Sequence, residues 1–246
     1  MRKIEKKIIA VIPCRIYSTR LFVKPLQNVG EYTILELLIK QLKKSKKIDE
    51  IVLAIAKTTG SELFTDFAKK NNLRYCLGSE SDVLERFIKT AKMFKGNIIV
   101  RITSDNPFIF WEGIDELINK HLEYECDLSC NYRLPLGAGL EVINREALEI
   151  AHDNGNKWDK EHCSPFIYKN PKKFKILKLK PDPQLERPDI RITVDTPQDL
   201  WVAQKIYLKL GRKGKPIQLK KIIKFLDSNP EIKKINSNLK HTKRYI

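Results

Sequence analysis

Long apolar runs are absent from this sequence of 246 residues, which excludes a helical membrane-spanning segment. No uninterrupted apolar stretch approaches the roughly 18 residues that a helix needs to cross a bilayer. Basic residues precede a short apolar stretch near the N-terminus, as in a secretory signal, but that stretch holds only about six residues and has no small-residue cleavage site. We therefore expect a first strand here, no membrane association and a cytoplasmic protein.

Cysteines are few and scattered, which disfavours both a disulfide framework and a zinc site. Their number, five, is odd, and only Cys126 and Cys130 lie close together, as a CxxxC pair in an expected strand. Zinc would require two further ligands at a suitable spacing, and none are evident. We expect reduced thiols in the core, as in a reducing compartment.

Glycine is missing from the N-terminal segment before Gly30, so neither common glycine-rich nucleotide motif begins the chain. The Walker A pattern GxxxxGK[ST] and the dinucleotide pattern GxGxxG are both absent there. A phosphate site in this segment must therefore depend more on side chains than on backbone groups.

Acidic residues are too few to balance the basic ones, and the formal net charge is +17. Lysines are spread over nearly every helix-like segment, and no aromatic-interleaved motif of an RNA-binding module occurs. We expect nucleic acid not to be the principal ligand. The excess positive charge still favours polyanionic small molecules.

Strand-like and helix-like segments alternate through the first half of the chain. Apolar strands separated by amphipathic helices predict an α/β fold, with a Rossmann-like, mainly parallel sheet flanked by helices. In such sheets ligands gather at the carboxyl ends of the strands, which selects the loops after Pro13, Ala56 and Thr103. The expected strands are 7–13, 51–56, 73–77, 97–103 and 126–131. The expected helices are 32–46 (with Thr33 as N-cap), 61–71, 81–94 and 111–124.

In the second half of the chain, strands and helices no longer alternate regularly. We expect strands at 136–144 and 175–180, a helix at 158–170, a strand, turn and helix start over 189–200, and a last helix at 216–227 that carries a proline early. No repeat or linker divides the chain, so residues 1–246 read as a single domain. Residues 132–188 are a candidate lid or dimerisation subregion, and residues 236–246 form a tail.

Polar and basic side chains crowd the loop after the first strand. Cations and hydroxyls at the carboxyl end of a strand suit a triphosphate, although a solvated basic loop is the simpler alternative. The candidates are Arg15, Ser18, Thr19, Arg20 and Lys24.

Two aspartates follow later strands. Asp105 stands in Thr-Ser-Asp-Asn-Pro, where it suits a Mg²⁺ ligand or a cap of the next turn. Asp195 precedes Thr196 and Pro197, which explain the start of a helix as N-cap and first residue without it. Asp195 is therefore available as a second metal ligand. Joined to the basic loop, these aspartates indicate Mg²⁺-dependent phosphoryl or nucleotidyl transfer, with pyrophosphate held by the loop.

Several segments together resemble the cytidylyltransferases that activate acidic sugars, the 3-deoxy-manno-octulosonate and acylneuraminate enzymes. IPCRIYSTRLFVKPL (12–26) is similar to their N-terminal signature, which binds CTP. The remaining segments are closest to the branch of the spore coat polysaccharide biosynthesis protein F, and occur in the same order over the whole chain: GSESDVLERF (78–87), RITSDNPFI (101–109), GLEV (139–142), KEHCSPFI (160–167), RITVDTPQDL (191–200) and NPEIKKIN (229–236).

The resemblance implies roles for individual residues. Triphosphate contacts are implied for Arg15, Ser18, Arg20 and Lys24, with Thr19 and Ser104 also on the nucleotide side. Base and ribose contacts are implied for Ser79, Asp82, Val83 and Arg86. Mg²⁺ would be held by Asp105 and Asp195. The acceptor side would be formed by Arg101, Asn106, Glu141 and His162, although a Glu paired with a lysine and a His at a helix end are simpler alternatives for the last two.

The first loop departs from the family pattern. Phe22-Val23 replaces the usual Pro-Gly, Tyr17 replaces a small residue, and Ser104 replaces a Gly before the metal-binding Asp. Because valine does not readily adopt the positive φ open to glycine, we expect this loop to follow another path or to lie farther from the phosphates.

The resemblance implies a CTP-dependent nucleotidyltransferase that activates a sugar, sugar acid or phosphorylated polyol as a CMP- or CDP-linked precursor for surface polysaccharide or glycoconjugate synthesis. It also implies a homodimer. Two alternatives stay open: a nucleotide-sugar-dependent glycosyltransferase, although only one Asp stands where a D-x-D motif is usual, and a catalytically weak nucleotide-binding homologue.

Overall fold

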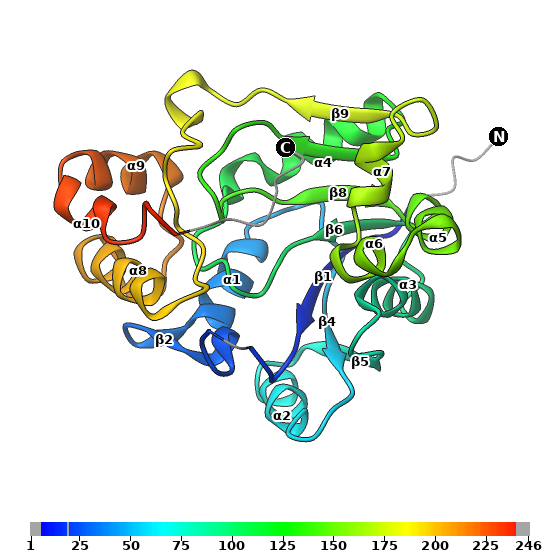
Figure 1. Ribbon diagram of the computed structural model, residues 1–246, viewed down its shortest axis with the longest axis horizontal. Helices are drawn as coiled ribbons and strands as arrows, with labels where there is room; N and C mark the ends of the chain where they lie inside the picture. The colour runs from blue at the N-terminus through cyan, green and yellow to red at the C-terminus, as the bar shows by residue number, and fades with distance from the viewer. Residues whose placement is uncertain (1–5, 19, 240–246) are drawn as a thin grey trace.

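A seven-stranded mixed sheet forms the centre of the computed structural model, which describes residues 6–18 and 20–239 (Figure 1). Its strand order is β5-β4-β1-β6-β8-β7-β9. Four strands form a parallel half: β1 (Ile8–Cys14), β4 (Glu50–Ala56), β5 (Arg74–Gly78) and β6 (Ile98–Arg101). β8 (Glu141–Asn144) runs antiparallel to both β6 and β7 (Leu128–Asn131), and β9 (Ile176–Leu179) pairs parallel with β7. The predicted α/β fold is confirmed.

Alternate residues of the central strands pack on opposite faces, as the period of two in a strand requires. Ala10 and Ile12 of β1 join a core with α1 (Ile34–Leu42), α2 (Glu62–Lys70) and α4 (Ile114–Glu123). Ile9 and Val11 join a second core with α3 (Val83–Met93), α5 (Arg145–Asn154) and the segment 163–174. The sheet is thus covered on both faces, which explains its near-continuous apolar strands.

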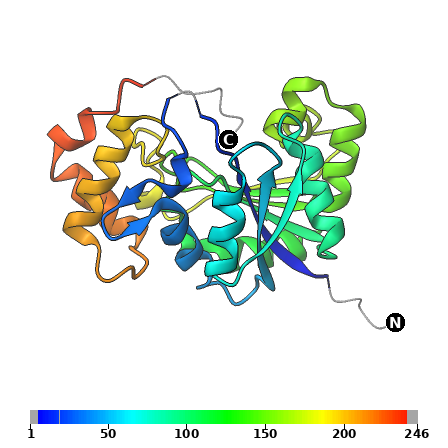
Figure 2. The ribbon, with the colours of Figure 1, turned by 90° about the horizontal axis from the view of Figure 1, so that it is seen from below.

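A third core lies beside the sheet. It packs α8 (Pro197–Leu210) and α9 (Leu219–Asp227) against α1 and the segment 185–194. α10 (Pro230–Lys234) and three short 3₁₀ helices complete the elements: η1 (Lys24–Leu26), η2 (Trp111–Gly113) and η3 (Pro183–Leu185). In both ribbon views α8–α10, orange to red, lie at one end of the molecule, and the yellow-green segment with α5, α6 (Lys157–His162) and α7 (Pro165–Lys169) lies at the other (Figures 1 and 2).

The first half matches the prediction closely. Thr33 caps α1 in a capping box with Glu36, which fixes the helix start. The preceding residues pair as β2 (Asn28–Val29) with β3 (Tyr32–Thr33), so the helix begins later than expected. All five cysteines are free and buried, as predicted.

Several predictions for the second half were wrong. The expected strand within 189–200 is only an isolated bridge between Leu136 and Arg191, because this segment packs on α8 rather than in the sheet. The expected helix at 158–170 is interrupted at Cys163, which has φ 70°. Pro216 lies outside α9, whose N-cap is Gln218. The strand at 136–144 is only Glu141–Asn144, and α5 and α10 were not anticipated.

The candidate subregion 132–188 contributes β8 and β9 to the main sheet, so it is continuous with the fold at this edge. Its role as a lid or dimerisation element stays a prediction. Within residues 6–18 and 20–239, no helix has both the length and the apolarity needed to cross a membrane.

Candidate active site

The two predicted aspartates lie together at the carboxyl edge of the parallel strands. Asp105 follows β6, and Asp195 stands just before Thr196, the N-cap of α8. The backbone N–H of Val194 donates to the carbonyl of Asp105 at 2.9 Å, which ties the two segments to each other. Residues 90 positions apart in the chain are therefore fixed side by side.

Lys24 from the first loop joins both aspartates. Its ammonium lies 2.6 Å from Asp195 Oδ1 and 3.7 Å from Asp105 Oδ2, and its side chain is 12% exposed. Arg20 of the same loop reaches Asp195 Oδ1 at 3.2 Å. The structure thus brings three segments that were predicted separately to one point.

The first loop contains valine in a conformation that glycine usually adopts. Val23 has φ 42° and ψ 48°, the left-handed conformation, immediately before η1. The premise that valine would avoid positive φ here was therefore wrong, and a different loop path or a position farther from the phosphates stays a prediction. The valine is buried in the core below the loop, and this packing offsets a strain of about 1–2 kcal/mol for a side chain at positive φ. The turn directs Lys24, the next residue, toward the aspartates.

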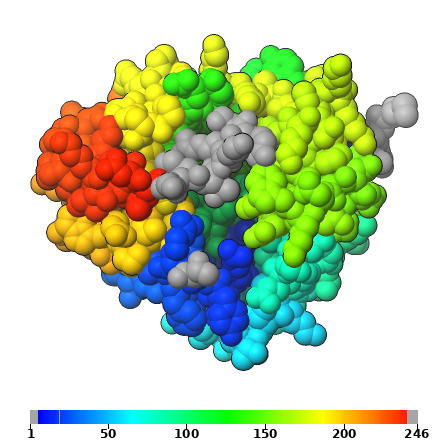
Figure 3. Space-filling view, viewed as in Figure 1, coloured from blue at the N-terminus to red at the C-terminus, as the bar shows by residue number. Residues whose placement is uncertain are grey.

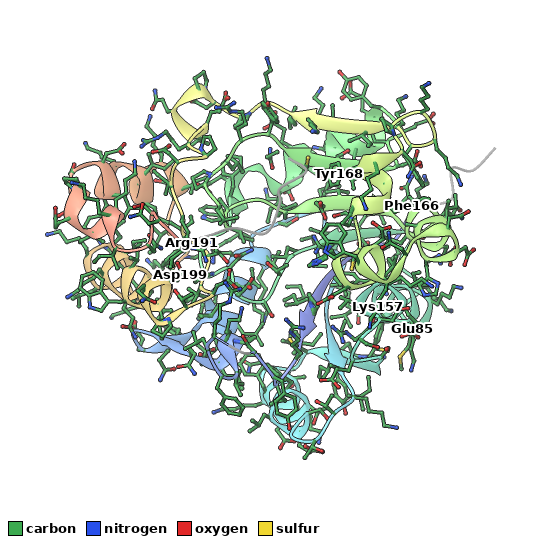
Figure 4. The ribbon with its side chains drawn as sticks, viewed as in Figure 1. Glu85, Lys157, Phe166, Tyr168, Arg191 and Asp199 are labelled. Atoms are coloured by element: carbon green, nitrogen blue, oxygen red, sulfur yellow. The ribbon has the colours of Figure 1, made fainter. Side chains whose placement is uncertain are left out.

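A buried network of hydrogen bonds holds the Asp195 carboxylate. Arg191 donates to both carboxylate oxygens of Asp199, at 2.6 and 2.7 Å, and to Asp195 Oδ2 at 3.0 Å. Asn236 donates to Asp199 Oδ1 at 2.8 Å, so the tail segment also reaches this network. Arg191 and Asp199 lie together between α8 and the centre of the molecule (Figure 4). Sequence reasoning missed the roles of Arg191 and Asn236, although both lie in motifs that the family resemblance had singled out.

The two aspartates have opposite electrostatic environments. Burial raises the pKa of Asp105, and Lys24 offsets this only in part. Burial also acts on Asp195, but Lys24, Arg20 and Arg191 outweigh it and lower its pKa. Two carboxylates that share one cation suit Mg²⁺, which is usually held by one or two carboxylates together with substrate phosphates and water. Among the described residues no cluster of three or more His, Cys, Asp or Glu could hold a metal. A metal held by Asp105 and Asp195 stays a prediction.

A cavity of about 370 Å³ opens above this point. The space-filling view shows the surface hollowed between the blue N-terminal loop and the yellow-green segment that carries α6 (Figure 3). We call it the nucleotide cavity. Its lining includes most of the predicted site residues: Arg15, Ser18, Arg20, Lys24, Val83, Arg86, Arg101, Ser104, Asp105, Asn106, His162 and Asp195. Thr19 lies outside the described residues.

Ser79 and Asp82 do not line this cavity in the described part of the chain. Asp82 caps α3 by accepting from the Glu85 N–H at 2.8 Å, and its other oxygen lies 2.9 Å from His152 Nε2. The Ser79 carbonyl accepts from Arg86 at 2.6 Å. The two residues thus shape the start of α3 and hold Arg86, whose side chain is almost fully buried and whose pKa is lowered mainly by that burial.

A second cavity, of about 270 Å³, adjoins the first. We call it the acceptor cavity, because its lining includes the four residues expected on the acceptor side: Arg101, Asn106, Glu141 and His162. The two share a wall formed by Arg101, Thr103, Asn106, Leu136, Gly137 and His162. Trp158 and Tyr168 add aromatic side chains to the lining of the acceptor cavity, and Trp158 packs against His162 with ring centroids 4.4 Å apart and ring planes tilted by 53°.

Glu141 and Arg101 form a buried ion pair in the acceptor cavity, with 2.8 Å between Oε2 and Nη1. The Tyr168 hydroxyl donates to the other Glu141 oxygen at 2.9 Å, and Arg101 Nη2 donates to the His162 carbonyl at 3.2 Å. Burial alone would lower the pKa of Arg101, but Glu141 and Cys163 together outweigh burial and raise it. The alternative that paired Glu141 with a lysine was wrong about the partner, which is Arg101. Tyr168 and Trp158 were not predicted, since no motif marked them.

The joint between α6 and α7 is a tight γ-turn. The N–H of Ser164 donates to the His162 carbonyl at 3.0 Å around Cys163, which has φ 70° and ψ −59°. Such turns are rare and strained, and they occur where the surrounding structure holds them. Here the turn places His162 on the wall between the two cavities.

Comparison with known proteins connects this geometry to a family. The family model described as cytidylyltransferase matches residues 9–235. An uncharacterised protein of Methanocaldococcus jannaschii is 40% identical over 95% of this chain and 96% of its own length. Spore coat polysaccharide biosynthesis protein SpsF of Bacillus subtilis is 29% identical over 91% of this chain and 95% of its own length.

Solved structures show the same fold. A cytidylyltransferase from Leptospira borgpetersenii superposes with a TM-score of 0.86 at 24% identity, covering 97% of this chain and all of that one. A CMP:2-keto-3-deoxy-manno-octonic acid synthetase in complex with CTP has a TM-score of 0.64 at 14% identity, covering 83% of this chain and 99% of that one.

Proposed function

The chain belongs to the cytidylyltransferase family, and we propose that it uses CTP and Mg²⁺ to activate a sugar-type acceptor with release of pyrophosphate. An acceptor oxygen forms a bond to the α-phosphorus while the bond to the bridging oxygen breaks. The observation that carries this proposal is the convergence of Asp105, Asp195 and Lys24 inside a basic cavity that shares a wall with a second cavity.

The nucleotide cavity supplies charge for a triphosphate. Arg15 and Arg86 line it, and within the described part of the chain neither has a carboxylate at ion-pair distance. Arginine suits phosphate because its planar donors pair with two oxygens at once. Mg²⁺ would be held by Asp105 and Asp195, where it would neutralise charge on the reacting phosphate.

The acceptor cavity would hold the sugar-type substrate. Trp158 and Tyr168 offer apolar ring faces, and Asn131 and Ser164 offer polar groups for hydroxyls. The name of SpsF and the CTP complex of the synthetase support a cytidylyl transfer in polysaccharide synthesis. Nucleotidyl transfer, rather than glycosyl transfer, follows from the family. A homodimer and a cytoplasmic location stay predictions.

The test is pyrophosphate release with each of the four ribonucleoside triphosphates against sugar acids, sugar phosphates and polyol phosphates. We expect turnover with CTP, only when Mg²⁺ is present, and with one acceptor class well above the others. Preference for another triphosphate would overturn the CTP assignment. Tight CTP binding without pyrophosphate release on any acceptor would indicate a binding homologue instead.

A further inference from the structure

We propose that the Lys24 ammonium is the internal counter-ion of Asp105 and Asp195 in the nucleotide-free protein, and that it leaves them for the triphosphate when the nucleotide and its metal bind. The inference rests on the proposed function for the identity of the nucleotide and metal. Lys24 would then have a second role besides contacting phosphate, because the same side chain would couple the binding of the nucleotide to the binding of the metal.

The first step is charge balance at the aspartates. Among the described residues, Lys24 is the cation within 4 Å of Asp105, whereas Asp195 also contacts Arg20 and Arg191. Asp105 is mostly buried, with a side chain 23% exposed. A carboxylate in that setting requires a nearby positive charge to stay ionised. Lys24 supplies it.

The second step concerns which of the three cations can leave the carboxylates. Arg191 cannot, because its side chain is 4% exposed and its guanidinium is held by two bonds to Asp199. Arg20 is half exposed, and within the described residues its one ion pair is with Asp195. Lys24 bears a compact ammonium on a flexible stem and lines the nucleotide cavity, so it can exchange partners without a change of fold.

The third step is the consequence for binding. A divalent cation at the two carboxylates would meet the Lys24 ammonium at the same oxygens, so the two positive charges exclude each other. A triphosphate in the cavity gives Lys24 a new partner and frees the carboxylates. Metal and nucleotide should therefore strengthen each other's binding, by the same factor in both directions.

The experiment is a titration of nucleotide-free protein with Mn²⁺, followed by electron paramagnetic resonance of the free ion. We expect Lys24→Met to bind Mn²⁺ at least about tenfold more tightly than the native protein. Adding Asp105→Asn to that variant should remove the gain, which assigns the ion to this site. Arg20→Met is the matched control: it removes a cation that, among the described residues, pairs with Asp195 and not with Asp105, and the expected gain is below about threefold.

A second measurement guards against poor folding of Lys24→Met. Thermal unfolding of Lys24→Gln and the native protein is followed with and without Mn²⁺, and the ion should raise the Tm of the variant more than that of the native protein. With a CTP analogue that has a methylene bridge between the α- and β-phosphorus, Mn²⁺ affinity should rise at least about tenfold in the native protein and less in Lys24→Met.

Equal Mn²⁺ affinity of native and Lys24→Met protein without nucleotide would overturn the inference. So would an unchanged native affinity when the analogue is added. Neither result depends on turnover. If the native protein released no pyrophosphate with any acceptor while Lys24→Met still bound Mn²⁺ more tightly, the proposed function would fail and the role of Lys24 would stand.

Discussion

The nucleotide cavity and the acceptor cavity share a wall, but they differ in whether their lining arginines are paired with acidic side chains. In the nucleotide cavity, Arg15 and Arg86 have no acid at ion-pair distance within the described residues, so positive charge is in excess. In the acceptor cavity both lining arginines are already paired, Arg101 with Glu141 and Arg133 with Glu186, each at 2.8 Å. The first is suited to a polyanion. The second is suited to recognising hydroxyls and shape.

The largest expected effect lies in the nucleotide cavity. Asp105→Asn and Asp195→Asn should each lower kcat for pyrophosphate release by about 10³-fold, because each removes a carboxylate that would hold the charge-neutralising metal. Asp66→Asn is the matched control, since this exposed residue pairs with Lys69 of the same helix, α2, and its loss should leave kcat unchanged. Near-native turnover of either site variant would show that the metal assignment is wrong.

The acceptor cavity should respond through its ion pair. Glu141→Gln leaves Arg101 buried beside a neutral partner, and a broken pair of this kind costs about 3–5 kcal/mol of unfolding free energy. Urea denaturation measures this loss. Tyr168→Phe removes only the hydroxyl that donates to Glu141, so it should cost about 1 kcal/mol.

Steady-state kinetics then separate the two cavities. Tyr168→Phe should raise the KM of the acceptor by about tenfold, because the Tyr168 hydroxyl would no longer hold the Glu141 carboxylate in the acceptor cavity. The KM of CTP should stay unchanged within about twofold. A rise in the KM of CTP as large as that of the acceptor would mean that the two cavities do not divide the substrates as we propose.

The two aspartates should have opposite effects on stability, although we expect both to be needed for turnover. The pKa of Asp105 is raised above its usual 3.8, so its ionisation costs folding free energy once the pH rises through that raised value. Asp105→Asn should therefore be more stable than the native protein at pH 7, and the difference should vanish at pH values below 3.8.

Asp195 has a lowered pKa, so its charge stabilises the fold above its usual 3.8, and this contribution is lost as the pH falls through the lowered value. Asp195→Asn should therefore be less stable than the native protein at pH 7. Thermal unfolding of both variants from pH 3 to 8 checks the signs. Destabilisation by both substitutions at pH 7 would contradict the difference in environment.

Sequence reasoning located the nucleotide cavity better than the acceptor cavity, and the reason is physical. Lys24, Asp105 and Asp195 each follow an expected strand or precede a capped helix, so local patterns place them at one edge of the sheet. Tyr168 and Trp158 lie on two short helices, and the γ-turn at Cys163 sets how these helices are placed relative to each other. No local pattern predicts that turn, because the surrounding packing imposes it. The segment at 189–194 was misread for a related reason: its apolar residues pack on α8, not in a sheet.

The smallest expected effect concerns Val23, whose left-handed turn directs Lys24 into the nucleotide cavity. Val52 is the matched position, since it is also a fully packed valine but lies in extended strand β4. At Val52, glycine should be less stable than alanine by about 1.5 kcal/mol, from lost burial and greater freedom of the unfolded chain.

At Val23 the relief of positive φ should offset that penalty, so that Val23→Gly and Val23→Ala unfold within about 0.5 kcal/mol of each other. Urea denaturation of the four variants gives both differences. An equal glycine penalty at the two positions would mean that Val23 stores no strain. A smaller penalty at Val23 would mean that a side chain is strained at this position, in the turn from which Lys24 reaches both aspartates.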